Sequence, residues 1–449
     1  MTSTTALHIH DLPVEVLSLI LGSVPGEKRG REFPFLELRL VCQLWNKIAS
    51  PHLFRTVQLG RGRRHPRSRW RKLLSCERIR KHIQHVQIDC QNGYPPNWRI
   101  TQWKLDFARM IDRLQHLEQL NELTIHFEKS CDLEGWPEGV SSKFISFFAT
   151  GARMWILSRL VTALKERAAT APNCRPIRSL TIHNLQNFPA WNMGGFDEPT
   201  DITFLSQSLR ELDLSFVSEN YAEPYYYEYG DWDLGKVKRC HFTPYLCNSW
   251  LIPTMSHLTS LSISSVERWG AIPSYFDGKG LEFPQLKSLT LGNFIIGHHD
   301  QFNWVLRQKS LQSLRLLNNT ILSYIFHDGI IKDHANIPMH DWVMLGDSQY
   351  YFPGTWAAVF DRILEELPHL KIFSFCSGIG VKPPQPGKLS HVRYILFHSC
   401  EHRIWNTGAF TDGDFELDWT TNRAKETFQG DTRAYESLLQ KIVQRLMKA

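Results

Sequence analysis

A short pattern of apolar residues returns nine times along the chain and limits the folds that it can adopt. Each copy has an apolar residue, two residues that are mostly polar, and then two apolar residues separated by one position, as at Leu286, Leu289 and Leu291. The alternation at the end of the pattern predicts a short β-strand with one buried and one polar face. The copies begin at Ile83, Leu120, Ile177, Leu209, Leu258, Leu286, Leu311, Leu370 and Val392.

Between these strands, the chain carries apolar residues at helical spacing. Residues 104–119, 144–169 and 356–367 are predicted to be helices, and each is followed by a copy of the strand pattern. A helix before a strand, repeated, predicts an α/β architecture built from stacked units. An amphipathic helix predicted at residues 433–447 would cover the open edge of the last unit.

The strand pattern resembles the leucine-rich repeat, in which each unit adds one strand to a curved parallel sheet. Successive copies begin 37, 57, 32, 49, 28, 25, 59 and 22 residues apart, whereas regular repeats run about 20–29 residues. The asparagine that normally follows the strand is found only at Asn293, Asn318 and Asn319. We therefore expect an irregular solenoid with inserted segments.

A densely apolar segment, residues 11–59, precedes the repeats. It is too short to bury a core of its own, so it is expected to pack on a partner or on the rest of the chain. A second helix is predicted to end at Ser50–Pro51. The first helix presents an apolar face formed by Leu12, Val16, Leu19 and Ile20. The second helix presents an apolar stripe formed by Val41, Leu44, Trp45 and Ile48.

Taken together, the two helices carry a more specific sequence pattern than either helix alone. The residues of this pattern are, in order, Leu12, Pro13, Glu15, Val16, Ile20, Leu40, Val41, Cys42, Trp45, Leu53 and Phe54. In this order they resemble the F-box, a three-helix module that binds the Skp1 adaptor of cullin–RING ubiquitin ligases. The resemblance covers about the first tenth of the chain. It implies that these residues contact Skp1, and we expect Trp45→Ala to cost about 2–4 kcal/mol of adaptor binding.

These observations predict an α/β protein, with a small all-α three-helix F-box followed by an irregular α/β leucine-rich-repeat-like solenoid with a curved parallel sheet. The predicted domains are the F-box at 8–59, a basic connector at 60–82, the solenoid at 83–400, and a C-terminal cap with an amphipathic helix at 401–449.

The basic connector sets the sign of the charge of the whole protein. The chain has a net charge of +6, yet residues 61–81 contain ten Lys or Arg and one acid, so the remaining 428 residues carry −3. Such a segment is typical of nuclear import or nucleic-acid binding. A solvated loop is the favoured alternative, because no aromatic platform surrounds it.

A second unusual segment, residues 219–233, combines five tyrosines and one tryptophan with five acids. Aromatic side chains of this kind offer large contact areas at low entropic cost. The segment is either a substrate-contact loop for a basic partner or an ordinary surface loop. The candidate contact residues are Tyr221, Tyr225, Tyr226, Tyr227, Tyr229 and Trp232. A further insertion, residues 328–353, has no clear chemistry.

Catalytic and metal-binding patterns are weak, so we predict no enzyme activity, catalytic residue, cofactor or metal. Phosphate-binding, dinucleotide-binding, esterase and zinc-protease motifs are absent from the sequence. His298–His299 is interpreted as a polar turn. Other histidines and cysteines lack partners at ligand spacing, namely Cys240, His241, Cys247, His398, Cys400 and His402.

The predicted function is the substrate-recognition subunit of an SCF-type (Skp1–cullin–F-box) E3 ubiquitin ligase, with a Skp1-like adaptor, through it a cullin, and an unknown protein target as partners. Nine cysteines without a regular framework suggest a reducing compartment, and no apolar run reaches the length of a membrane span, so a cytoplasmic or nuclear location is expected. The alternatives are a non-degradative scaffold that binds the adaptor, or a nuclear nucleic-acid-binding protein that uses residues 61–81.

Overall fold

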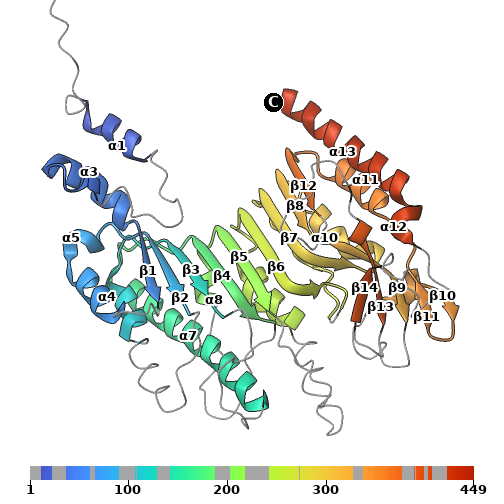
Figure 1. Cartoon of the computed structure of the whole chain (residues 1–449), viewed down its shortest axis with the longest axis horizontal. Coiled ribbons are helices and arrows are strands. Elements are labelled where there is room, and N and C mark those ends of the chain that lie inside the picture. The colour runs from blue at the N-terminus through green and yellow to red at the C-terminus, as the bar shows by residue number, and fades with distance from the viewer. Residues whose placement is uncertain are drawn as a thin grey trace, which may run out of the picture. The chain divides into compact units, whose positions relative to one another are not determined.

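The computed structural model describes a mixed α/β protein with a large, mostly parallel sheet (Figure 1). It divides into two compact units, unit 1 with Met1–His126 and Ser158–Arg178, and unit 2 with Phe127–Leu157 and Ser179–Ala449. The described residues are 12–22, 37–60, 66–90, 107, 109–128, 142–187, 203–217, 242–272, 274–326, 337–376, 389, 391–398, 403–406 and 422–448.

All nine predicted strands are present, and each begins two residues after the first apolar residue of its copy. That first residue therefore closes the incoming turn, while the two later apolar residues point into the core, as Leu289 and Leu291 do with no exposed surface. The nine strands are β2 (His85–Asp89), β3 (Glu122–His126), β4 (Ser179–Gln186), β5 (Glu211–Val217), β6 (Ser260–Trp269), β7 (Ser288–Ile296), β8 (Ser313–Leu317), β12 (Ile372–Cys376) and β13 (Tyr394–His398).

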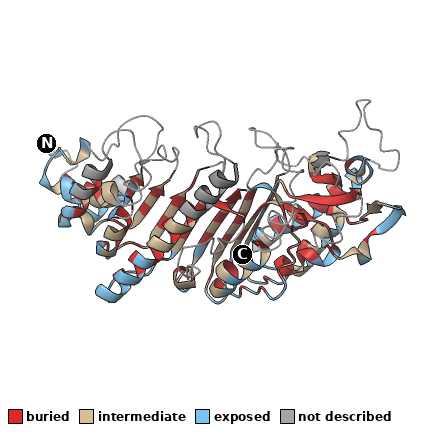
Figure 2. Cartoon of the chain, turned by 90° about the horizontal axis from the view of Figure 1, so that it is seen from below, coloured by how far each residue is buried: buried red, intermediate tan, exposed pale blue. Residues whose placement is uncertain are grey.

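In unit 2, six strands lie side by side in the order β4, β5, β6, β7, β8 and β12, and every neighbouring pair is parallel (Figure 1). Equivalent positions of successive copies are in register, so that Leu261 pairs with Leu289 and Leu289 with Leu314. The buried residues of these strands alternate with half-buried ones along the chain (Figure 2). The local pattern thus stacks its apolar positions into one continuous core.

Strand β7 is longer than β8 and has two neighbours along its length. Its start pairs with β8, and its end pairs with β9 (Thr320–Phe326) at Ile295 and Ile296. β9 also pairs in parallel with β13 and antiparallel with β11 (Gln349–Tyr351). β11 forms a hairpin with β10 (Val343–Gly346), and β13 pairs with β14 (Arg403–Asn406). The ninth copy therefore lies beside β9, and the insertion predicted at 328–353 contains a β-hairpin.

In unit 1, three parallel strands lie in the order β1 (Thr56–Gly60), β2 and β3. The sequence prediction missed β1, whose Val57 and Leu59 face the core within the range assigned to the first module. A buried arginine joins the second half of α7 (Ser142–Thr170) to this unit. The Arg167 guanidinium donates hydrogen bonds of 2.7–3.0 Å to four backbone carbonyls, those of Leu117, Glu118, Leu120 and Arg175.

The longer helices largely follow the apolar spacing. α7 and α11 (Trp356–Glu366) confirm two predictions, and α13 (Phe428–Lys448) begins earlier than predicted. The helix predicted at 104–119 is shorter, since η3 (Arg113–His116) ends it as a 3₁₀ turn. The remaining short elements are α8 (Thr203–Ser206), η5 (Leu246–Leu251), η6 (Ile252–Thr254), η7 (His299–Phe302), α10 (Asn303–Leu306), η9 (Met339–Asp341), η10 (His391–Arg393) and α12 (Arg423–Glu426).

Three copies of the strand pattern are followed by an asparagine whose backbone lies in the left-handed region. The φ angle is 60° at Asn184, 58° at Asn293 and 55° at Asn318. Each stands two residues after the last inward-pointing residue of its copy. The side-chain amide of Asn184 donates to the Phe127 carbonyl at 2.9 Å, and that of Asn293 donates to the Ser265 carbonyl at 2.5 Å. Asn184 was missed in the sequence, although it stands at the same position in its copy as Asn293 and Asn318.

Among the described residues, no helix is both long enough and apolar enough to cross a membrane.

Candidate protein-docking surface

The N-terminal module of unit 1 is built from α1 (Val14–Gly22) and α3 (Gln43–Phe54). Pro13 precedes α1, where its missing N–H is harmless, and its carbonyl accepts the first helical hydrogen bond from the Leu17 N–H at 3.0 Å. α3 passes through Pro51 and ends only at Phe54, so the predicted end at Ser50–Pro51 is wrong. Pro51 has no N–H to donate to the Lys47 carbonyl, so one bond of the helical ladder is missing at this position.

The core of this module consists of four side chains, Leu17, Trp45, Ile48 and Ala49, each less than one-tenth exposed. Trp45, which we expected to anchor the adaptor at the surface, is thus an internal packing residue. Partly buried residues surround this core, namely Leu12, Leu38, Leu44 and Leu53. The second apolar stripe is therefore used within the module, apart from Val41, which is 55% exposed.

The apolar face predicted for the first helix points the other way. Leu19 is 75% exposed, and its helical neighbours Val16 and Ile20 are 38% and 42% exposed. The turn before α3 adds Leu40, which is 85% exposed. We call the exposed apolar residues Val14, Val16, Leu19, Ile20, Leu40 and Val41 the N-terminal docking surface.

The described packing of α1 supplies little stabilisation. Isolated helices shorter than about 12 residues are marginal in water, and α1 has nine. Of its residues from Val14 to Ile20, only Leu17 is buried, which contributes roughly 2 kcal/mol. Fixing the backbone costs about 1–2 kcal/mol for each residue before hydrogen bonding and packing offset it. Burial of the exposed apolar side chains by another protein would supply the missing stabilisation.

Polar contacts hold the turn that carries Leu40 and Val41 against α3. The Arg39 guanidinium lies 5.0 Å from the centre of the Phe54 ring, and its Nε donates to Asn46 Oδ1 at 3.0 Å. The Ser50 hydroxyl donates to the same Asn46 oxygen at 3.0 Å. These bonds preorganise the turn, and they leave Phe54 only half-buried. The other residues of the predicted adaptor site, Pro13, Glu15 and Cys42, are exposed.

The basic connector is helical where it is described. Residues expected to form a solvated loop form α4 (Pro66–Ser75), followed by α5 (Glu77–Arg80). Trp70 is buried, and its indole N–H donates to the Met110 carbonyl at 3.3 Å. Its ring is therefore not available to stack on a nucleic-acid base. Residues 61–65 lie outside the described part of the chain.

The proposed substrate-contact tyrosines and Trp232 also lie outside the described residues, as do Cys240, His241, Cys400 and His402. Cys247 is described, and burial raises the pKa of its thiol to about 11, so it remains protonated near neutral pH.

A histidine cluster in unit 2 corrects the polar-turn interpretation of His298–His299. His298 is buried, and its Nε2 lies 2.8 Å from His340 Nε2 and 3.0 Å from Asp341 Oδ2. Because His298 Nδ1 accepts the Asp300 N–H at 3.1 Å, the hydrogen bonding assigns the proton to Nε2. A metal at Nε2 would have to displace that proton and break the Nδ1 bond. The group is better described as a hydrogen-bonded cluster, although its three ligand atoms lie within 4.8 Å of one another.

Comparison with known proteins adds no relative. No model of a protein family matches the chain, and a search of curated proteins finds no match.

Proposed function

We propose that this chain is a substrate receptor that binds a Skp1-type adaptor through the N-terminal docking surface. The observation that carries the proposal is that α1 and the turn before α3 expose six apolar side chains, whereas the described residues of the module bury four in its core. The resemblance of the same segment to the F-box names the class of adaptor. A location in the cytoplasm or the nucleus follows from that partner.

The parallel sheet of unit 2 gives such a receptor a rigid platform for a protein target. In this proposal the chain is not an enzyme, and it contributes by holding the target near a ubiquitin-charged enzyme carried by the same assembly. The tyrosine-rich segment at 219–233 remains a candidate for target contact.

The test is co-purification of the full chain with a Skp1-type adaptor, followed by titration. The variant combines Leu19→Ser, Leu40→Ser and Val41→Ser, which lie on the surface and leave the four core residues intact. We expect each substitution to cost about 1–2 kcal/mol of binding, so the triple variant should lose detectable co-purification.

A matched control places the same change at exposed apolar residues elsewhere, with Val266→Ser, Met344→Ser and Met447→Ser. This control should bind the adaptor as the unmodified chain does. Equal adaptor affinity of the two triple variants would reject the proposed surface. Ubiquitin transfer to a captured target in a reconstituted ligase then separates a receptor from a scaffold that only binds the adaptor.

A further inference from the structure

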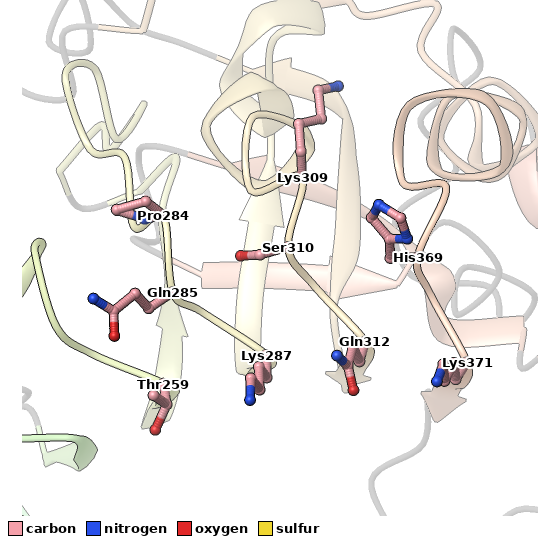
Figure 3. A pocket seen from close by; sticks show the side chains of 9 residues that line it. All are labelled: Thr259, Pro284, Gln285, Lys287, Lys309, Ser310, Gln312, His369 and Lys371. Atoms are coloured by element: carbon pink, nitrogen blue, oxygen red, sulfur yellow. The ribbon is translucent and has the colours of Figure 1, made fainter.

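Four polar residues form a row at the amino-terminal ends of neighbouring strands in unit 2. Thr259, Lys287, Gln312 and Lys371 directly precede β6, β7, β8 and β12. The backbone N–H of Lys287 donates to the Thr259 carbonyl, that of Gln312 to Lys287, and that of Lys371 to Gln312, each at 2.8 Å. This ladder holds the four side chains side by side, pointing the same way (Figure 3). The second positions of these four repeat copies therefore form one column.

An open pocket of about 670 Å³ lies along this row. None of the described residues that line it is acidic, and none is Phe, Tyr or Trp. They come from the turns before the four strands, and they are Thr259, Pro284, Gln285, Lys287, Lys309, Ser310, Gln312, His369 and Lys371 (Figure 3).

The three lysines of the pocket differ in how their charge is compensated. Lys309 Nζ donates to the Glu366 carbonyl at 2.9 Å and lies 3.6 Å from the Glu366 carboxylate. Lys287 and Lys371 are exposed, and within the described part of the chain neither forms an ion pair with a carboxylate. Two uncompensated ammonium groups thus flank the amide of Gln312.

We propose that this row binds an acidic, extended polypeptide segment, with Lys287 and Lys371 each pairing with one carboxylate. Adjacent strands lie about 4.8 Å apart, so residues two strands apart are separated by roughly 10 Å. In an extended peptide of polyproline II conformation, which has three residues per turn, side chains i and i+3 lie on the same face about 9 Å apart. Gln312 lies between the lysines and can bond the intervening peptide backbone through its amide.

The spacing favours separated carboxylates over a single phosphate. A phosphate group concentrates its charge on oxygens a few ångströms apart and is best matched by the planar fork of arginine. The described lining has no arginine, and its two uncompensated charges lie at a distance from each other. Proteins that bind single-stranded nucleic acid stack its bases on aromatic rings, and the described lining offers the imidazole of His369 but no Phe, Tyr or Trp. The inference depends on the proposed function in one respect, because it takes the acidic segment to be part of the protein target.

The test is fluorescence anisotropy of the full chain with a labelled peptide that carries glutamate at every third position among serines and alanines. A peptide with glutamine in place of glutamate is the ligand control. We expect Lys287→Glu combined with Lys371→Glu to weaken binding of the acidic peptide at least about tenfold, since each reversal replaces attraction by repulsion. Binding should also weaken as salt is added.

A matched variant reverses two exposed lysines outside the pocket, Lys279→Glu and Lys441→Glu, at the same change in net charge. It should keep the affinity of the unmodified chain to within about twofold. All variants are first compared by circular dichroism, and Lys287→Gln with Lys371→Gln gives a milder pair if the reversed pair does not fold.

Equal effects of the pocket and control variants, or equal binding of the glutamine peptide, would overturn the inference. Tighter binding of a phosphoserine peptide without glutamate, or of a single-stranded oligonucleotide, would likewise replace the acidic peptide by another ligand. No adaptor is present in this assay, so loss of peptide binding and loss of adaptor binding are separate results.

Discussion

Arg393 and Asp431 form an ion pair with no exposed surface on either side chain, and Arg393 Nε lies 2.8 Å from Asp431 Oδ2. The carboxylate also accepts bonds from the Tyr394 hydroxyl at 3.0 Å, the Thr427 hydroxyl at 2.8 Å and the Ala357 N–H at 2.9 Å. One carboxylate on α13 thereby holds the start of α11 and the arginine that precedes β13. The surrounding bonds satisfy both charges, which is the condition under which a buried pair is tolerated.

Removing one partner of this pair should destabilise unit 2 strongly. We expect Asp431→Ala to lower the free energy of unfolding by about 3–5 kcal/mol, because the buried Arg393 charge then loses the Asp431 carboxylate. Chemical denaturation measures the loss. The exposed pair of Lys309 and Glu366 is the control, and Lys309→Ala should change stability by less than about 1 kcal/mol. Similar losses in the two variants would contradict this account.

Substitution of Trp45 should act on folding of the N-terminal module before it acts on binding. Trp45→Ala removes the largest of the four core side chains, and the expected loss of stability is about 3–5 kcal/mol. Hydrogen exchange of α1 and α3 should rise in this variant. It should remain unchanged in Leu19→Ser, whose side chain is exposed. Unchanged exchange in Trp45→Ala would show that the tryptophan is not part of the core.

Two substitutions of Asn293, whose backbone is left-handed, should lower the stability of the protein to different extents. Asn293→Ala should lose about 2 kcal/mol, from backbone strain at φ of 58° and from the lost bond to the Ser265 carbonyl. Asn293→Gly relieves the strain but not the bond, so it should lie between the alanine variant and the unmodified chain. Thermal unfolding of the three proteins checks the order. A glycine variant less stable than the alanine variant would show that backbone conformation is not the main effect.

Acidification should destabilise the folded chain partly through His298. Burial lowers the pKa of His298, and the opposing effect of Asp341 is smaller. The unfolded chain therefore binds a proton at a pH where the folded chain does not, and stability should fall as the pH drops below about 6.5.

The check is the melting temperature between about pH 7 and pH 5. His298→Asn keeps an acceptor for the Asp300 N–H but cannot titrate, so its melting temperature should depend less on pH. His369→Asn is the control, since His369 is exposed and lies outside the cluster. The same pH dependence in both variants would exclude His298 as the source.

The strands could be predicted from the sequence because alternation with a period of two is a local property. Leu289 and Leu291 are buried whereas their neighbours Ser288 and Thr290 are only half-buried, and this alternation does not depend on distant parts of the chain. The helices α7 and α11 follow from local apolar spacing in the same way.

The order of the strands could not be read in this way. β13 lies beside β9 and not beside β12, because β7 carries two neighbours along its length. The contact of His298 with His340 joins residues 42 positions apart, and no local pattern encodes it.

The N-terminal docking surface shows what the sequence could predict and what it could not. The sequence by itself determined that Val16, Leu19 and Ile20 share one helical face and that Trp45 and Ile48 share another. Only the tertiary structure decided that the second face is buried within the module and the first is exposed. The physical reason is that the spacing of apolar residues determines which helical face gains free energy when it leaves water. Which other part of the structure covers that face depends on the tertiary packing.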